Sequence, residues 1–145
     1  MNTTDHTVDC LNSMLRGELA ATETYEQALA KFAAEPHAAE LQRIQAEHHE
    51  VVNKLRQHIR QCGGKPARTS GAWGTWAKLV EGAAKLFGAK AALKALKEGE
   101  EQGISDYEKA LHDEGLAEEC KSIIRDELLP QTQSHVRSLD RLMEV

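Results

Sequence analysis

Two acidic residues lie at matching positions of a repeated segment and could act together as metal ligands or proton acceptors. The repeat covers residues 17–29 and 99–111, and six of its thirteen positions are identical. Each copy holds a glutamate followed seven residues later by a tyrosine, Glu18 with Tyr25 and Glu100 with Tyr107. Helical periodicity puts both glutamates on apolar, core-facing stripes. Because an ionised carboxylate buried without a partner costs several kcal/mol, each requires a cation, a proton or a hydrogen-bond donor.

Two histidines elsewhere in the chain could be the partners of these carboxylates. Helical periodicity turns His48 and His135 inward and puts Glu47 and Glu127 at the edges of the same stripes. Imidazole nitrogen together with carboxylate oxygen is a ligand set suited to iron, manganese or zinc. Two alternatives stay open: the histidines only hydrogen-bond and neutralise the repeat glutamates, or the repeat is merely structural, since its residue types are common in helices.

Five helical segments would position these side chains. Amphipathic periodicity, with the glycines and prolines at the segment ends, predicts helices over about 5–34, 36–62, 75–87, 89–114 and 116–144. Residues 63–74 contain glycine, proline and serine and are typical of a linker. Pro130 predicts a kink in the last helix, because proline lacks the backbone N–H and its ring crowds the carbonyl four residues earlier.

The order of these helices predicts an all-α fold, a four-helix bundle of two hairpins joined by one long crossover that carries the short helix 75–87. About 26 connecting residues can reach back along a bundle some ~40 Å long. A chain of 145 residues fits a single domain, residues 1–145. The hairpins would be related by a rough twofold axis, with Glu18 facing Glu100. Without a cation between them, at least one of the two should hold a proton more tightly than a free glutamate does.

Composition excludes several other classes of protein. A net charge of −5 and a pI near 5.8 argue against a nucleic-acid binder that relies on a basic surface. The sequence has no long apolar run and begins without the features of a signal peptide, which predicts a cytoplasmic protein that does not enter membranes. It also lacks a glycine-rich phosphate loop, a nucleophile elbow and a CxxC pair.

The remaining reactive or aromatic side chains are assigned to packing. Cys10, Cys62 and Cys120 lie on or near apolar stripes and are interpreted as buried structural thiols. Trp73 and Trp76 are expected to clamp the crossover onto the bundle. Five further histidines are set aside as surface or packing residues: His6, His37, His49, His58 and His112.

Taken over nearly its whole length, the chain resembles the ferritin-like superfamily and, within it, a bacterial family of short, uncharacterised four-helix-bundle proteins. Iron-oxidising members take one glutamate from the first and third long helices and a Glu-x-x-His pair from the second and fourth. Glu18 and Glu100 match the first part of this pattern. The second and fourth helices depart from it, because they read Glu47-His48-His49-Glu50 and Glu127-Leu128-Leu129-Pro130.

The resemblance implies a metal-binding bundle. Its expected ligands are Glu18, Glu47, His48, Glu50, Glu100, Glu127 and His135, holding one or two ions of iron, or of manganese or zinc. With iron, the centre could oxidise Fe(II) with O2 or peroxide, and Tyr25 or Tyr107 would act beside it as a hydrogen-bond donor or electron source. The alternative is a non-enzymatic bundle without metal that acts by protein association or in a stress response. A homo-oligomer is compatible with either function.

Overall fold

The structure of the protein, a computed structural model, describes residues 3–31 and 37–144, and the regular secondary structure in these ranges is helical. The elements are α1 (Thr3–Lys31), α2 (His37–Gln61), the 3-10 turn η1 (Gly71–Gly74), α3 (Thr75–Phe87), α4 (Ala89–Leu111), α5 (Glu118–Ile123), the π-helical turn η2 (Ile124–Leu128) and α6 (Leu129–Met143). The predicted all-α class is confirmed. Residues 34 and 36, predicted to end the first helix and begin the second, lie outside the described residues.

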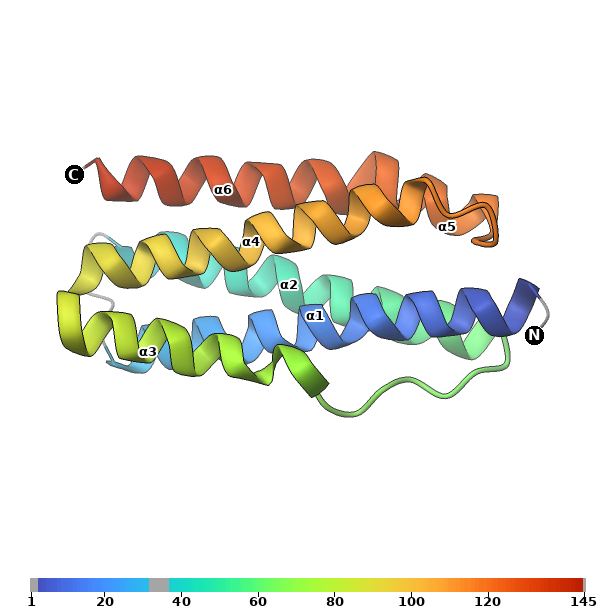
Figure 1. Ribbon diagram of the computed structural model, residues 1–145, viewed down its shortest axis with the longest axis horizontal. Helices are drawn as coiled ribbons and strands as arrows, with labels where there is room; N and C mark the ends of the chain where they lie inside the picture. Colours follow the sequence, from blue (N-terminus) through green and yellow to red (C-terminus); the bar gives the residue numbers. More distant parts are fainter. Residues whose placement is uncertain (1–2, 32–36, 145) are drawn as a thin grey trace.

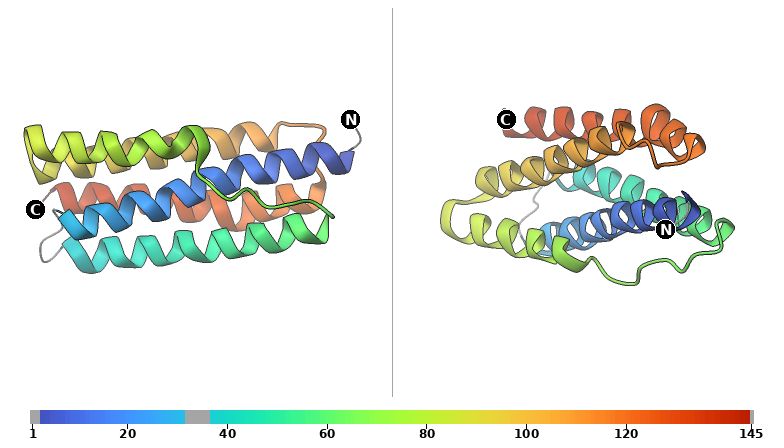
Figure 2. Two further views of the ribbon diagram at one scale, coloured as in Figure 1. Left: turned by 90° about the horizontal axis from the view of Figure 1, so that it is seen from below. Right: turned by 45° about the vertical axis from the view of Figure 1, so that its right-hand side comes forward.

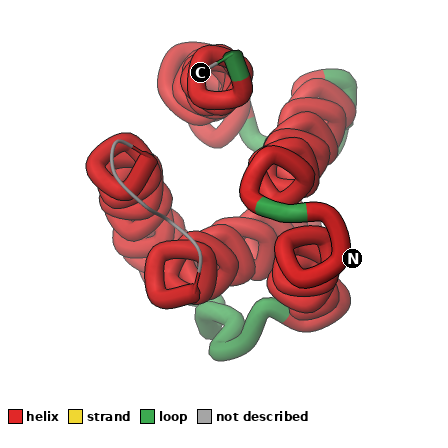
Figure 3. The backbone as a smooth tube through the Cα atoms, turned by 90° about the vertical axis from the view of Figure 1, so that its left-hand side faces the viewer, coloured by secondary structure: helices red, strands yellow, loops and turns green. Residues whose placement is uncertain are grey.

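The helices form two antiparallel pairs joined by one long crossover. α1 packs against α2, and α4 packs against α6 (Figure 1). After α2 the chain runs back along the bundle as an extended segment, and α3 completes the return to the end at which α4 begins (Figure 2). α3 lies against α1 and α4, and an end-on view shows the helices arranged around a common interior (Figure 3). The predicted crossover with its short helix is therefore confirmed.

The interior consists of two apolar clusters with a polar layer between them. One cluster surrounds Tyr25 and includes Ile44 and Leu96, and the other surrounds Leu15 and Leu55. The polar layer is supplied by residues that follow these apolar positions by about one turn of their helices: Glu18, His48 and Glu100. Apolar packing on both sides lowers the effective dielectric constant around this layer, which strengthens the electrostatic interactions inside it.

The crossover is attached through indole rings that lie on the two repeat glycines. Trp76 is buried, and its Nε1 donates a hydrogen bond to the Ala95 carbonyl at 3.1 Å. A Cβ on Gly99 would lie 2.0 Å from the Trp76 ring, so only glycine fits there. The equivalent Gly17 faces the half-buried ring of Trp73, whose Nε1 would lie 3.3 Å from a Cβ. The repeat thus places a glycine immediately before each buried glutamate, and both tryptophans pack on the bundle.

The last long helix is interrupted about two turns before His135. α5 passes into the π-helical turn η2, in which the Leu129 N–H donates to the carbonyl of Ile124, five residues earlier. A π turn is wider than an α turn and leaves room beside the ring of Pro130, which cannot donate to a carbonyl. The disturbance predicted from Pro130 therefore takes the form of one π turn just before the proline.

α3 is amphipathic, and part of its apolar face is exposed. Trp76 and Val80 are buried, whereas Leu79, Leu86 and Phe87 are 66%, 76% and 79% exposed. Among the described helices, none combines the length and the apolarity that crossing a bilayer requires.

Candidate metal centre

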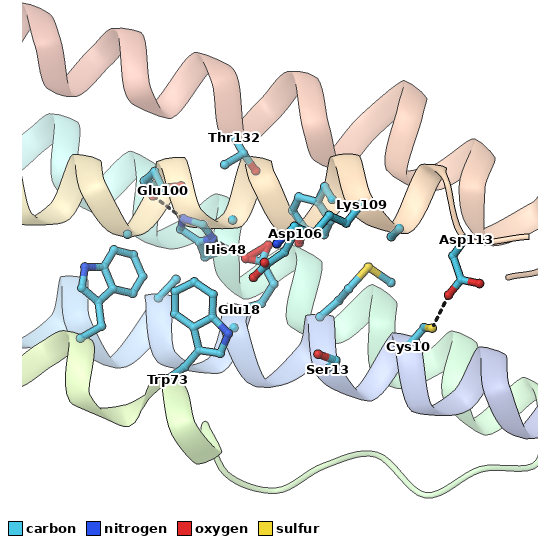
Figure 4. Close-up of a pocket in the computed structure, with 18 residues that line it drawn as sticks. Cys10, Ser13, Glu18, His48, Trp73, Glu100, Asp106, Lys109, Asp113 and Thr132 are labelled. Atoms are coloured by element: carbon cyan, nitrogen blue, oxygen red, sulfur yellow. Dashed lines mark hydrogen bonds and ion pairs between the residues drawn. The ribbon is translucent and has the colours of Figure 1, made fainter. Parts of the chain in front are cut away.

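Four helices supply the side chains of the polar layer. Glu18 comes from α1, His48 from α2, Glu100 from α4 and His135 from α6, and Figure 4 shows how Glu18, His48 and Glu100 converge. All four are buried, with exposed fractions of 6%, 3%, 2% and 0% in that order. Polar groups are rarely buried this deeply unless they are paired or coordinate a metal. The inward direction predicted for these four side chains is thus observed.

His48 lies between the two repeat glutamates. Its Nδ1 is 2.8 Å from Oε2 of Glu18, and its Nε2 is 2.8 Å from Oε2 of Glu100. Both nitrogens can donate to carboxylates only if both carry a proton, that is, as imidazolium. The imidazolium of His48 therefore provides the positive charge that the two buried carboxylates were expected to require.

His135 continues the chain of hydrogen bonds toward the surface. Its Nδ1 is 3.3 Å from Oε1 of Glu100, and its Nε2 is 2.7 Å from Oε1 of Glu47. The other oxygen of Glu47 accepts from Arg43 at 3.0 Å, one helical turn earlier on α2. Glu47 therefore joins the buried layer from its edge, and Arg43 links the layer to solvent.

The charges of this layer shift the pKa values of its members. Burial alone would lower the pKa of His48, but the negative charges of Glu100 and Glu18 outweigh it and raise the pKa well above 6.5. Burial alone would raise the pKa of Glu100, but the positive charge of His48 and hydrogen bonds from His135 and His48 hold it below 4.5. Glu100 therefore does not hold a proton more tightly than a free glutamate, because the imidazolium of His48 lies between the two glutamates and supplies the cation.

The two repeat tyrosines each interact with the glutamate of the other repeat. The Tyr25 hydroxyl donates to Oε2 of Glu100 at 2.6 Å, and the Tyr25 ring lies 5.6 Å from that of His48. Burial and the negative charge of Glu100 raise the pKa of Tyr25 well above 10. Burial and the charge of Glu18, which also accepts a hydrogen bond, raise the pKa of Tyr107 in the same way. Both tyrosines therefore stay protonated and hold the carboxylates in place.

The structure does not bring two of the expected ligands to the centre. Glu50 is exposed on α2, because it lies two residues beyond the inward-facing His48 on a helix of 3.6 residues per turn. Glu127 is exposed in η2 and forms an ion pair with Lys54. The layer thus contains three carboxylates and two imidazoles from the expected set: Glu18, Glu47, His48, Glu100 and His135.

The donor atoms of this layer are close enough to hold a cation. One ligand atom each from His48, Glu100 and His135 lies within 4.8 Å of the others. Imidazole and carboxylate are ligands of iron, manganese and zinc, and the oxygens of Glu18 and Glu47 lie beside the two rings. Because an imidazole binds a metal ion only in its neutral form, a bound ion would displace protons that now join the ring nitrogens to the carboxylates. The residues present therefore fit a transition-metal ion.

A cavity of about 320 Å³ between α1 and α4 leads to this layer. Glu18, His48 and Glu100 line its inner end, and Trp73 lies on one side of it (Figure 4). Trp76 also lines the cavity. A cavity of this volume can admit an ion with its water molecules or O2. The centre is buried but reachable.

Residues 6–113 match a family described as a domain of unknown function, DUF2383. The chain belongs to this family. The same fold occurs in a protein whose crystal structure is described as a ferritin like, diiron-carboxylate protein from Bacillus anthracis str. Ames. The two structures agree with a TM-score of 0.76 at 17% sequence identity, over 99% of each chain, which confirms the ferritin-like fold. No curated protein sequence matches the chain.

Some residues of functional interest were overlooked in the sequence or, like His6 and Cys10, assigned only to packing or the surface. Arg43 pairs with Glu47 and could have been found from the i, i+4 spacing of opposite charges on one helix. His6 and Cys10 have the same spacing on α1 and lie beside Asp113. Only tertiary structure brings Asp113 to them, since it is more than 100 residues away in sequence.

Proposed function

We propose that residues 1–145 form one metal-binding domain whose buried centre takes one or two transition-metal ions, with iron as the first candidate and manganese or zinc as alternatives. The observation that carries this proposal is the buried cluster of His48, Glu100 and His135, with its donor atoms within 4.8 Å of one another. Helix bundles commonly build metal sites from carboxylates and imidazoles on facing helices. The likeness to a diiron-carboxylate protein supports the same choice of metal.

In this proposal each residue of the layer has a defined task. His48, Glu100 and His135 would hold the first ion, with Glu18 and Glu47 at either side for a second. Iron, if bound there, would supply one-electron redox chemistry toward O2 or peroxide. Tyr25 keeps Glu100 oriented through its 2.6 Å hydrogen bond. Because His48 must give up a proton to become a ligand, metal uptake releases protons and strengthens as pH rises.

Association without metal is the second candidate function. Two observations favour it: the exposed apolar side chains of Leu79, Leu86 and Phe87 on α3, and the fact that every buried polar side-chain atom among the described residues already has a hydrogen-bond partner. In that case the polar layer only fixes the packing of the bundle. Bound metal distinguishes the two candidates.

The test is elemental analysis of protein purified without chelator, combined with titration of Fe(II) in air and of Mn(II). We expect uptake of Fe(II) and its oxidation by the wild-type protein. Glu100→Ala and Glu18→Ala should lose both while circular dichroism shows intact helices. Glu50→Ala is the matched control, since Glu50 is an exposed carboxylate on α2. Glu127→Ala is a second control on η2.

Two outcomes contradict the proposal. If the wild-type protein takes up no more Fe(II) or Mn(II) than the Glu100→Ala variant, the centre binds no metal and association replaces it. If Glu50→Ala is as damaging as Glu47→Ala, the three-residue spacing of the superfamily governs the site instead of the arrangement described above.

A further inference from the structure

A second group of potential ligands lies at the outer end of the same cavity. His6 and Cys10 come from α1, and Asp113 comes from the turn that follows α4. The Nε2 of His6 is 2.7 Å from Oδ2 of Asp113, and Sγ of Cys10 is 3.6 Å and 3.5 Å from these two atoms. All three residues are half-buried, and Cys10 and Asp113 line the cavity (Figure 4). This cluster shares no residue with the buried centre.

The surrounding backbone holds the three side chains in position. The Gly115 N–H donates to Oδ1 of Asp113 at 2.9 Å, which leaves Oδ2 for His6 and Cys10. A Cβ on Gly115 would lie 2.8 Å from Cδ2 of His6, so the imidazole occupies space that only glycine leaves free. The Ala117 N–H donates to the Thr7 hydroxyl at 3.3 Å and fixes the same turn on α1. Hydrogen bonds of this kind orient the ligands of metal sites.

The distances match those of a tetrahedral ion. Zinc bonds are about 2.3 Å to sulfur and about 2.0–2.2 Å to nitrogen and oxygen, which separates sulfur from either other ligand by about 3.5 Å and nitrogen from oxygen by about 3.3 Å. The observed sulfur distances of 3.6 Å and 3.5 Å already agree with these values. Only the 2.7 Å contact of His6 with Asp113 has to widen, by about 0.6 Å.

We propose that His6, Cys10 and Asp113 bind one divalent cation of the zinc class, with a fourth position open to solvent and the cavity. A thiolate, a carboxylate and a neutral imidazole carry a charge of −2, which balances the ion. The Cys10 thiol loses its proton to water when the sulfur–metal bond forms. Thiolate and imidazole favour zinc, whereas the oxygen-rich inner centre suits iron or manganese. The two sites therefore differ in the metal they select.

A reactive thiol without metal is the main alternative for this cluster. Burial and the hydrogen bond to Asp113 raise the pKa of Cys10 to about 11, so that the free thiol stays protonated near neutral pH. Nucleophilic or redox-sensing cysteines have lowered pKa values instead. A plain ion pair between His6 and Asp113, with Cys10 as a bystander, is the other alternative and predicts no metal–sulfur bond.

Titration of the full-length protein with Co(II), a coloured substitute for zinc, tests the proposal. We expect a thiolate-to-cobalt charge-transfer band, with the visible bands of tetrahedral cobalt, that disappears on addition of Zn(II). Cys10→Ser should abolish the charge-transfer band. Gly115→Ala should weaken Co(II) affinity about 10- to 100-fold by displacing His6, as for other changes behind a metal ligand.

The controls separate this site from the buried centre. Cys62→Ser and Cys120→Ser change the other two cysteines and should leave the charge-transfer band intact. Glu100→Ala disrupts the inner centre and should also leave it intact, so the outer site can be confirmed even if the inner centre binds no metal. Absence of the band in the wild-type protein, or its persistence in Cys10→Ser, overturns the proposal.

Discussion

Replacement of Gly99 by alanine tests how tightly the crossover covers the centre. A Cβ at this position would lie 2.0 Å and 2.2 Å from two carbons of the Trp76 ring, so the ring has to leave its site. The ring would lose its burial, its hydrogen bond to Ala95 and its edge-on contact with Tyr25. Loss of a buried tryptophan costs about 3–5 kcal/mol, and alanine in place of glycine inside a helix returns about 1 kcal/mol. We therefore expect a net loss of about 2–4 kcal/mol in the free energy of unfolding.

The assay is urea unfolding of the metal-free protein, followed by circular dichroism and tryptophan fluorescence, with the midpoint compared at constant m value. Gly82→Ala is the matched control, because nothing lies within 4 Å of its Cβ, and it should gain about 1 kcal/mol. Gly17→Ala should fall between the two, since its Cβ would meet the half-buried Trp73 ring at 3.3 Å. If Gly99→Ala proves as stable as Gly82→Ala, the indole is not held by the glycine and the reasoning fails.

Three further predictions concern the polar layer of the metal-free protein. Because the pKa of His48 is raised in the folded protein, its stabilising contribution is complete below pH 6.5 and is lost as pH rises through the folded pKa. Because the pKa of Glu100 is lowered, its contribution is complete above pH 4.5 and is lost as pH falls through the folded pKa. Urea midpoints measured against pH should decline at both ends, and His48→Gln should lack the decline at alkaline pH. Tyr25→Phe should cost about 1.5–3 kcal/mol, because it removes a buried hydrogen bond to a charged group, and a smaller loss by urea unfolding would show that Tyr25 does not stabilise Glu100. Glu127→Gln should change stability by less than about 1 kcal/mol, since its partner Lys54 is exposed too, and a larger change would assign Glu127 a structural role.

The sequence was sufficient for the fold and for the inward direction of four functional side chains. The internal repeat predicted that Glu18 and Glu100 occupy equivalent buried positions, and helical periodicity predicted the burial of His48 and His135. These predictions succeed because the period of an α-helix is known, so the spacing of residues in the sequence determines which side of the helix each side chain faces. The same periodicity explains why Glu50, expected as a ligand from the resemblance, lies exposed on α2.

The contacts between helices could not be predicted in the same way. The pairing of each His48 nitrogen with a particular glutamate depends on the axial shift and the rotation of one helix relative to another. Sequence spacing within one helix does not determine either quantity. For the same reason, the sequence could not show that Tyr25 donates its hydrogen bond to Glu100 on α4 and not to Glu18 on its own helix. The proximity of Asp113 to Cys10 depends on how the turn after α4 packs on α1.

The spacing of apolar residues in the last long helix indicates the π turn, but it is not recognised when a regular α-helical period is assumed throughout. The buried residues of the last long helix follow three successive steps of four: Cys120, Ile124, Leu128 and Thr132. Each such step drifts about 40° on an α-helix, so three of them would leave the core-facing side. A wider turn corrects the drift, and Pro130 alone suggested only a kink.

Because η2 accommodates one residue more than an α turn would, the direction of His135 depends on the conformation of this turn. If the same residues formed a continuous α-helix, the additional residue would rotate everything that follows by about 100° relative to α5. The imidazole of His135 would then leave the polar layer although no residue of the layer had been replaced. Removal of one residue from this turn would instead allow a continuous α-helix in which α5 and α6 keep their relative direction, so in the evolution of such a bundle the loss of one codon here would preserve the centre.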